Sequence, residues 1–224
     1  MRAGRSSNQE TETSPARLGV SNLNCRFNGD AGLRAQGYSG IIERIMSTAP
    51  DTLIAQGYTA RREHRPDDAK KHFTEAIELC RMTNDPSGLA QALAGLGQIE
   101  RDLHNGAAAR SHYEEATALC RTFGHPLALA HTIRHLGDIL REQGELAPAE
   151  VCYREALGIY RQEKETPPLD LANAIRGIAL LKVRTREVEE AKSFWREAKD
   201  LYASLQVQAG VDEGVRYLSL LEQM

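Results

Sequence analysis

The sequence lacks the patterns on which several classes of protein depend. Its four cysteines include no Cys-x-x-Cys pair, so they support neither a disulfide scaffold nor a thiolate zinc site. The net charge of −3 excludes the basic field of nucleic-acid-binding proteins and of proteins held at an anionic membrane. No apolar run reaches the roughly 18 residues that span a bilayer, and the N-terminus has no apolar signal-peptide core. We therefore expect a cytoplasmic protein whose partner is neither nucleic acid nor membrane.

Aromatic residues make up only 5% of the 224 residues, whereas alanine, leucine, glutamate and arginine dominate after about residue 50 and favour helix. Residues 1–46 have a different composition, rich in glycine, serine, asparagine, glutamine and threonine, and show little hydrophobic periodicity. We expect this stretch to be a disordered or weakly structured leader, with a short helix in GIIERIM at 40–46. Residues 47–224 are expected to form one helical domain.

From residue 50 onward the sequence repeats itself in steps of 40 and 42 residues. LAQALAGLG at 89–97 returns as LAHTIRHLG at 129–137 and as LANAIRGIA at 171–179. A second pattern keeps the same steps: AKKHFTEAIELC at 69–80, ARSHYEEATALC at 109–120, AEVCYREALGIY at 149–160 and AKSFWREAKDLY at 191–202. Apolar residues recur at helical spacing in both halves, so each unit is a hairpin of two helices, A and B. A hairpin cannot bury both faces alone, and the units must therefore stack.

Small residues recur at fixed places in these units. Helix B has alanine on either side of an aromatic residue, as in Ala109, Tyr113 and Ala116, while helix A has glycine in three of the four units. Glycine inside a helix costs ~1 kcal/mol against alanine, so its recurrence indicates a tight helix contact. The expected repeats occupy about residues 50–86, 87–126, 127–167 and 168–208, followed by a capping helix at 209–223.

The pattern of Leu-Gly in helix A, then alanine, aromatic and alanine in helix B, resembles the tetratricopeptide repeat. Its unit of 40–42 residues exceeds the usual length of about 34 and is similar to the variety in kinesin light chains and bacterial sensor proteins. The resemblance covers about residues 50–223 and implies an all-α fold, a right-handed superhelical α-solenoid of helix-turn-helix repeats. It also implies that helix A lines a concave groove that binds protein or peptide, without catalysis and without a cofactor.

The stretch HTIRH at 131–135 raises a different hypothesis. His131 and His135 lie on one helix face, Asp138 follows one turn later, and two histidines with a carboxylate can hold a catalytic metal. The glutamate that stands beside the first histidine in zinc proteases is Thr132 here, so the general base is missing. We therefore favour an ordinary helix face without metal, and keep a metal-dependent hydrolase as an alternative.

The expected groove carries mainly arginine and amide side chains, which suit carboxylates and peptide backbone. Six arginines face three acidic residues, Asp102, Asp138 and Glu142, so we expect a protein or peptide partner with net negative charge. The alternative from another class is a regulatory sensor module that binds a signalling peptide or an effector domain. The expected groove residues are Tyr58, Arg61, Gln91, Gln98, Arg101, His131, Arg134, Asp138, Arg141, Asn173, Arg176 and Arg184.

Overall fold

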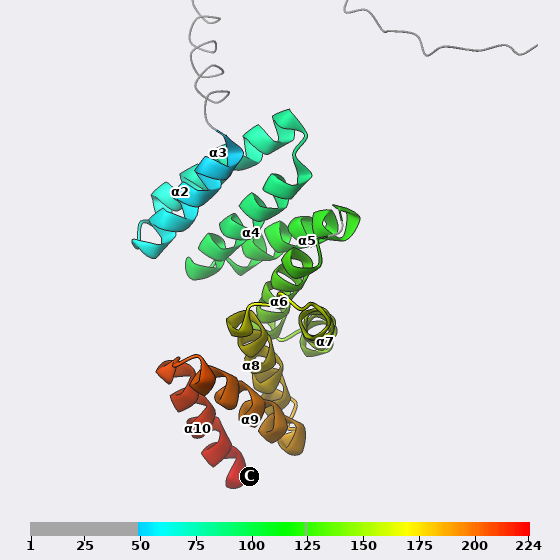
Figure 1. The fold of residues 1–224 in the computed structure, drawn as a ribbon. Coiled ribbons are helices and arrows are strands. Elements are labelled where there is room, and N and C mark those ends of the chain that lie inside the picture. Colours follow the sequence, from blue (N-terminus) through cyan, green and yellow to red (C-terminus); the bar gives the residue numbers. More distant parts are fainter. Residues whose placement is uncertain (1–48, 124) are drawn as a thin grey trace, which may run out of the picture. The chain divides into compact units, whose positions relative to one another are not determined.

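Helices account for all the regular structure in the computed structural model, which describes residues 49–123 and 125–224 (Figure 1). They are α2 (Pro50–Arg62), α3 (Pro66–Thr83), α4 (Pro86–Asp102), α5 (Gly106–Phe123), α6 (Pro126–Gln143), α7 (Leu146–Gln162), α8 (Pro168–Arg184), α9 (Val188–Ser204) and α10 (Gln208–Glu222). Each predicted unit holds two of these helices, and α10 is the helix expected at 209–223. The predicted leader at 1–46 and the first two residues of the predicted domain lie outside the described residues.

Proline and left-handed turns set the ends of the helices. α2, α3, α4, α6 and α8 begin with proline, whose fixed φ suits the first helical position. Between helix A and helix B of each pair one residue has a positive φ: His64 (56°), His104 (63°), Gly144 (86°) and Arg186 (62°). The N–H of the next residue then reaches back to helix A, as from Asn105 to the carbonyl of Glu100 at 2.7 Å. The four turns therefore share one geometry.

The helices form two layers. Every helix packs against its sequence neighbours, and the A helices also contact one another, α2 with α4, α4 with α6 and α6 with α8. Within the described residues no such backbone contact joins the B helices α3, α5, α7 and α9. Long side chains bridge them instead, Arg81 to Glu115 at 2.9 Å, Arg121 to Glu155 at 2.7 Å and Arg161 to Glu197 at 2.9 Å. We call the surface formed by α2, α4, α6 and α8 face A, and the surface formed by the B helices face B.

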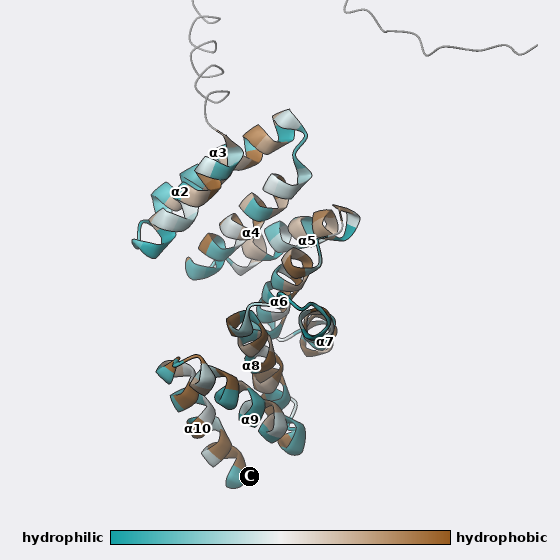
Figure 2. Ribbon diagram, in the orientation of Figure 1, coloured by the Kyte–Doolittle hydropathy of each residue, from teal (hydrophilic) through white to brown (hydrophobic). Residues whose placement is uncertain are grey.

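A buried ring at the centre of helix B holds each pair together. Phe73, Tyr113, Tyr153 and Trp195 are fully buried, as are the alanines on either side of them. The glycine of helix A faces this ring, since a Cβ added at Gly97 would lie 2.9 Å from Tyr113. The close approach inferred from the glycine column is therefore present. Figure 2 shows hydrophobic and hydrophilic residues alternating along the helices, as expected of amphipathic helices that bury one side.

The same rings contact helix A of the following pair. The positions that meet them are Gly95, His135, Gly177 and Tyr217. At the two glycines the absence of a side chain makes room for the ring. At the other two a second ring stacks on the first, His135 on Tyr113 with centroids 5.3 Å apart and Tyr217 on Trp195 with centroids 4.5 Å apart. His135 is thus part of the contact between successive repeats.

Candidate functional site

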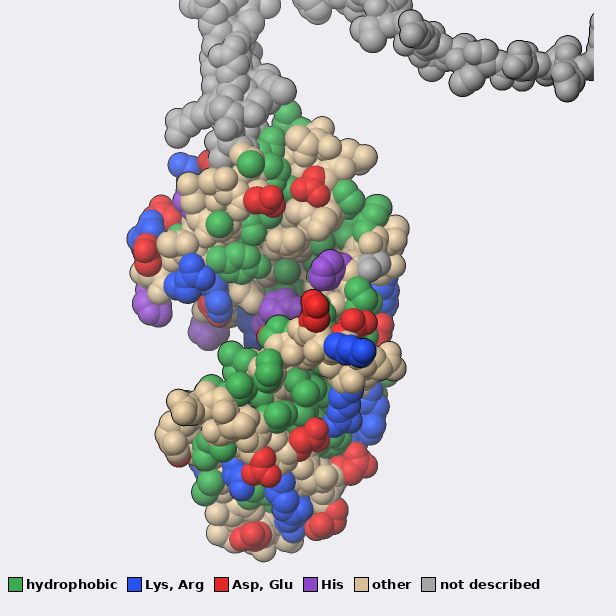
Figure 3. Space-filling model, in the orientation of Figure 1, with side chains coloured by type: hydrophobic (Ala, Val, Ile, Leu, Met, Phe, Trp, Pro, Cys, Tyr) green, Lys and Arg blue, Asp and Glu red, His purple; other side chains and the backbone are tan. Residues whose placement is uncertain are grey.

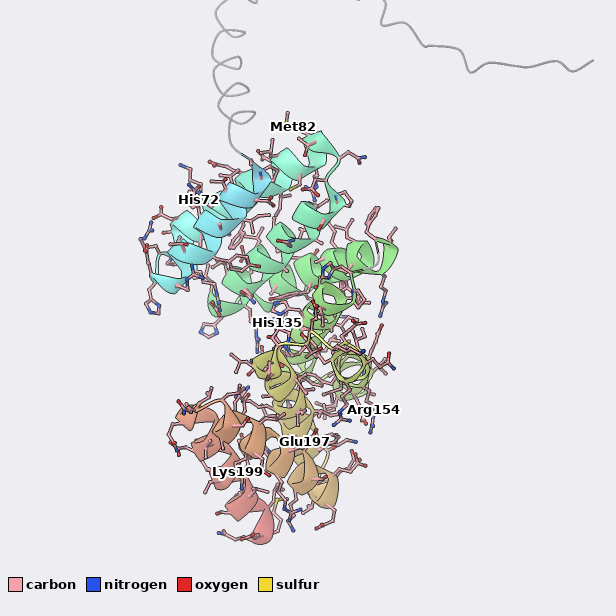
Figure 4. All side chains as sticks on the ribbon, viewed as in Figure 1. His72, Met82, His135, Arg154, Glu197 and Lys199 are labelled. Atoms are coloured by element: carbon pink, nitrogen blue, oxygen red, sulfur yellow. The ribbon has the colours of Figure 1, made fainter. Side chains whose placement is uncertain are left out.

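His135 lies where α4, α5 and α6 meet, in the interior of the helical stack (Figure 4). Its Nε2 atom lies 2.8 Å from Nη2 of Arg134 and 3.2 Å from Nε2 of Gln98. Because a guanidinium group can only donate hydrogen bonds, Nε2 is the acceptor and Nδ1 carries the proton. Burial and the positive charge of Arg134 hold the pKa of His135 well below its usual value. The ring is therefore a neutral connector between helices.

These contacts oppose the metal-dependent hydrolase alternative. The Nε2 lone pair of His135, which a metal would need, is engaged by two donors. The carboxylate of Asp138 accepts from the hydroxyl of Tyr153 at 2.7 Å and from Nη1 of Arg101 at 3.2 Å. A cation at this place would also face two guanidinium groups. Among the residues that the structure describes, no group of three His, Cys, Asp or Glu side chains is arranged to hold a metal ion.

Asp138 is the centre of a buried polar network that joins successive repeats. Its partners come from α4 and α7, and Nη1 of Arg134 lies 3.5 Å from it on the same helix. Arg141 extends the network, because its Nε donates to the hydroxyl of Tyr153 at 3.2 Å. Arg134 and Asp138 are only 7% and 8% exposed. Both predicted groove residues therefore lie mostly inside the stack, where Arg134 binds His135 and Asp138 binds Tyr153.

The remaining arginines of the predicted groove mostly pair with acids of the next repeat. Arg61 binds Asp102 at 2.9 Å, Arg101 binds Glu142, and Arg176 binds Glu213 of α10. Arg184 occupies the position of Asp102 and Glu142 in its own repeat, and it donates to the backbone carbonyl of Arg141 instead. Of the six predicted groove arginines, Arg184 is the one that has no acidic partner in residues 49–123 and 125–224. The expected excess of positive charge is therefore largely neutralised.

A pocket of about 330 Å³ lies between the N-terminal halves of α4 and α6, with the end of α5 and part of α2 completing its wall. It brings together three predicted groove residues from three A helices, Tyr58, Gln91 and His131. Phe123, 59% exposed, also lines it. The volume is that of a small-ligand or side-chain site, for which roughly 300–1,000 Å³ is usual. Figure 3 shows histidine side chains next to apolar side chains on the face seen in that view.

Comparison of the repeats in the sequence did not single out Glu213, Ala94 or Cys120, which shape face A. Glu213 neutralises Arg176, and it lies 37 residues further along the chain, the same step that separates Arg101 from Asp138. Asn173, predicted as a groove residue, accepts from the hydroxyl of Tyr202 at 2.7 Å. Ala94 and Cys120 line the pocket but carry no chemical signature of their own. A column-by-column comparison of side-chain size between repeats is the signal that could have found them.

Comparison with known proteins agrees with the architecture. The family described as tetratricopeptide repeat matches residues 49–122 and 88–162. The chain belongs to the tetratricopeptide repeat family. The resemblance drawn from the sequence, and with it the all-α solenoid fold, is therefore confirmed. No curated protein matches this tetratricopeptide repeat chain in sequence.

Solved structures share the fold of this tetratricopeptide repeat chain at low sequence identity. BtubC (BKLC) from P. vanneervenii is 18% identical, with a TM-score of 0.63 over 80% of this chain and 75% of its own. The apo form of RapI is 11% identical, with a TM-score of 0.68 over 81% of this chain and 68% of its own. A STAND signal-transduction ATPase with a tetratricopeptide repeat sensor from Pyrococcus horikoshii is 14% identical, with a TM-score of 0.66 over 85% of this chain and 31% of its own.

Family and fold together support a repeat scaffold for protein interaction or regulation. None of the described helices combines the length and the apolar character that crossing a bilayer requires.

Proposed function

We propose that the chain is a non-catalytic scaffold that binds a segment of a partner protein along face A. The observation that carries this proposal is the pocket between α4 and α6, because Tyr58, Gln91 and His131 reach one hollow from three successive A helices. Further along face A, Arg61, Arg176 and Arg184 keep part of their side chains in solvent. Such groups can bind the backbone and the polar side chains of an extended segment.

Because most predicted groove arginines are already paired with acidic side chains, the charge of the partner should contribute little to its affinity. A preference for a net negative segment rests chiefly on Arg184, since the other predicted groove arginines already have acidic neighbours. We therefore expect the apolar pocket to contribute more affinity than net charge. Dissociation constants around micromolar, or ~8 kcal/mol, are expected, with only a modest loss of affinity as salt increases.

The second candidate function is a regulatory sensor module that binds a signalling peptide or an effector domain. Its support is the fold shared with the repeat sensor of the STAND protein, of whose chain the matched part is 31%. The two candidates differ in what lies next to the repeats in the cell. A separate binding protein favours the scaffold, whereas an effector encoded beside this chain favours the sensor.

Two triple variants test the use of face A. The partner is first identified by affinity capture with the full chain, and its affinity is then measured by isothermal titration calorimetry. Arg61→Ala, Arg176→Ala and Arg184→Ala together should weaken binding at least tenfold. The matched control combines Arg81→Ala, Arg121→Ala and Arg161→Ala, which removes three arginines that are 50–55% exposed on face B and changes the net charge equally. Loss of binding in the control, with retention in the face A variant, would refute the proposal.

A further inference from the structure

The pocket exists because two columns of the repeat hold small residues at the same time. In helix A, Ala94 occupies the position held in the other three repeats by Ile54, Arg134 and Arg176. In helix B, Cys120 occupies the position held by Cys80, Tyr160 and Tyr202. The first repeat combines isoleucine with cysteine, and the third and fourth combine arginine with tyrosine. Among the four repeats, the second is the one in which both positions are small.

In the third and fourth repeats large side chains fill the corresponding volume. Tyr160 and Tyr202 are 2% and 3% exposed, so both rings lie inside the stack. The hydroxyl of Tyr202 donates to Oδ1 of Asn173 on its own helix A at 2.7 Å. Gln91 is the residue of the second repeat that corresponds to Asn173, and it lines the pocket. The second repeat therefore keeps the hydrogen-bonding end of this arrangement and lacks the ring.

The chemistry of the wall matches a ring with a neutral polar end. None of the described residues that line the pocket is Lys, Arg, Asp or Glu. Burial and the nearby charge of Arg134 lower the pKa of His131 to about 4, so its imidazole is neutral at physiological pH. Gln91 and His131 thus offer uncharged donors and acceptors in an otherwise mainly apolar hollow. A charged group would lose its hydration here without gaining a counter-charge.

We propose that this pocket receives a tyrosine side chain from the partner segment bound on face A, its ring taking the volume that Tyr160 and Tyr202 fill in their own repeats and its hydroxyl meeting Gln91. A cavity of roughly 150 Å³ holds benzene, so about 330 Å³ has room for a phenol ring and the adjoining methylene groups. The exposed ring of Phe123 lies at the same pocket and can cover the bound side chain. This inference rests on the proposed function, because the tyrosine belongs to the partner.

A small probe tests the pocket without the partner. p-Cresol, which is the tyrosine side chain capped with hydrogen, is titrated into the full ¹⁵N-labelled chain, and amide shifts are followed by NMR. Saturable shifts at Ala90, Gln91, Ala94 and Thr132 are expected, with millimolar affinity. Toluene, which lacks the hydroxyl, should bind about threefold or more weakly because it leaves Gln91 unpaired. Absence of saturable shifts at these residues would overturn the proposal.

A larger side chain introduced in the wall of the pocket should block the binding of a partner tyrosine. Cys120→Tyr gives the second repeat the residue that the third and fourth already have, so the protein should fold, lose p-cresol binding and bind the partner at least tenfold more weakly. Ala94→Leu fills the same hollow from helix A, and this variant is used in the same measurements if Cys120→Tyr does not fold. Ala118→Tyr adds the same ring at an exposed position of α5 outside the pocket and should change neither measurement.

The outcomes separate this inference from the proposed function. If Cys120→Tyr binds the partner as tightly as the wild type does, the tyrosine proposal is wrong, whereas loss of binding in the face A arginine variant still supports the scaffold. If neither change affects the partner, both proposals fail.

Discussion

Lowering the pH from 7 to 5 should destabilise the protein, mainly through His131 and His135. Both rings are neutral in the folded chain, since burial first and Arg134 second lower their pKa values. Protonating His135 would also abolish the acceptor that Arg134 and Gln98 use, and it would place a cation beside a guanidinium group. In the unfolded chain both rings have a pKa near 6.5. Below that pH the unfolded state binds more protons, so the free energy of unfolding falls as the pH falls.

For His131 the size of the effect follows from its pKa in the unfolded and in the folded chain. For His131, a change from 6.5 in the unfolded chain to about 4 in the folded chain lowers the free energy of unfolding by ~2 kcal/mol at pH 5. His135 acts in the same direction, so we expect a total loss of more than ~2 kcal/mol, a large share of the ~5–15 kcal/mol that stabilises a typical domain. Paired carboxylates such as Glu100 and Glu150, whose pKa values are lowered, lose their contribution only below about pH 4.3. The window from pH 7 to 5 therefore isolates the histidines.

Urea unfolding followed by circular dichroism at 222 nm, at pH 7.0 and at pH 5.0, measures this difference. The comparison protein is His131→Gln with His135→Gln, in which the amide oxygens can still accept hydrogen bonds but no group titrates. Its loss of stability between the two pH values should be smaller than that of the wild type by ~2 kcal/mol or more. His112, whose pKa burial also lowers, remains in both proteins and cancels from the comparison. Equal losses in the two proteins would refute the assignment of buried, neutral histidines.

Three further predictions concern helix packing, a buried ion pair and the turns. Ala116→Leu should lower the free energy of unfolding by ~1–3 kcal/mol because Ala116 is fully buried. Ala118→Leu, on the exposed side of α5, should change it by less than ~0.5 kcal/mol. Equal melting temperatures of the two variants would contradict the assignment of the buried side of α5. Lys182→Glu should cost ~3–5 kcal/mol in urea unfolding because Lys182 is 2% exposed and contacts Glu150 at 2.8 Å and Glu187 at 2.7 Å. Adding Glu150→Lys should restore only part of the loss, because Glu187 and Glu190 remain. Gly144→Ala should lower the free energy of unfolding by ~1 kcal/mol, and His104→Gly should raise it, because both positions have a positive φ. Thermal melts that show the opposite signs would exclude this account of the turns.

The repeat period was enough to predict the helices and their pairing. Alanine, aromatic and glycine columns recur at one spacing, and each has a packing cause that the sequence displays directly: the glycine of helix A makes room for the ring of helix B. Proline at helix starts marks boundaries because its ring fixes φ, and Gly144 marks a turn because glycine adopts a positive φ without steric cost. These are local or periodic properties, so one sequence without relatives suffices to recognise them.

The placement of individual polar residues could not be predicted in the same way. Arg134 and Arg176 share one column, yet Arg134 is 7% exposed and binds His135, while Arg176 keeps contact with solvent and pairs with Glu213. Their surroundings differ along the stack, because α6 contacts α8, whereas no such backbone contact joins α8 and α10 in the described residues. For the same reason, the sequence did not reveal that His135 is an internal contact, whose ring is bonded by Gln98 of α4 and stacks on Tyr113 of α5.

The repeats also show when a change in residue marks a function and when it does not. Lys70 of α3 pairs with the buried Glu100 at 2.7 Å, and the equivalent positions of a later repeat hold Glu150 and the buried Lys182, so the charges have changed sign together and the contact is kept. Such paired exchange preserves the fold and says nothing about a ligand.

At Ala94 and Cys120 both columns hold small residues, no neighbouring side chain fills the volume, and a pocket of about 330 Å³ remains. Because this pocket opens to solvent and is mainly apolar, an apolar group that enters it removes apolar surface from water, which contributes roughly 25 cal/mol per Å². A partner side chain that occupies the pocket would gain this free energy in the complex, which is why we place the main anchor at the second repeat and give the arginines of face A a secondary part.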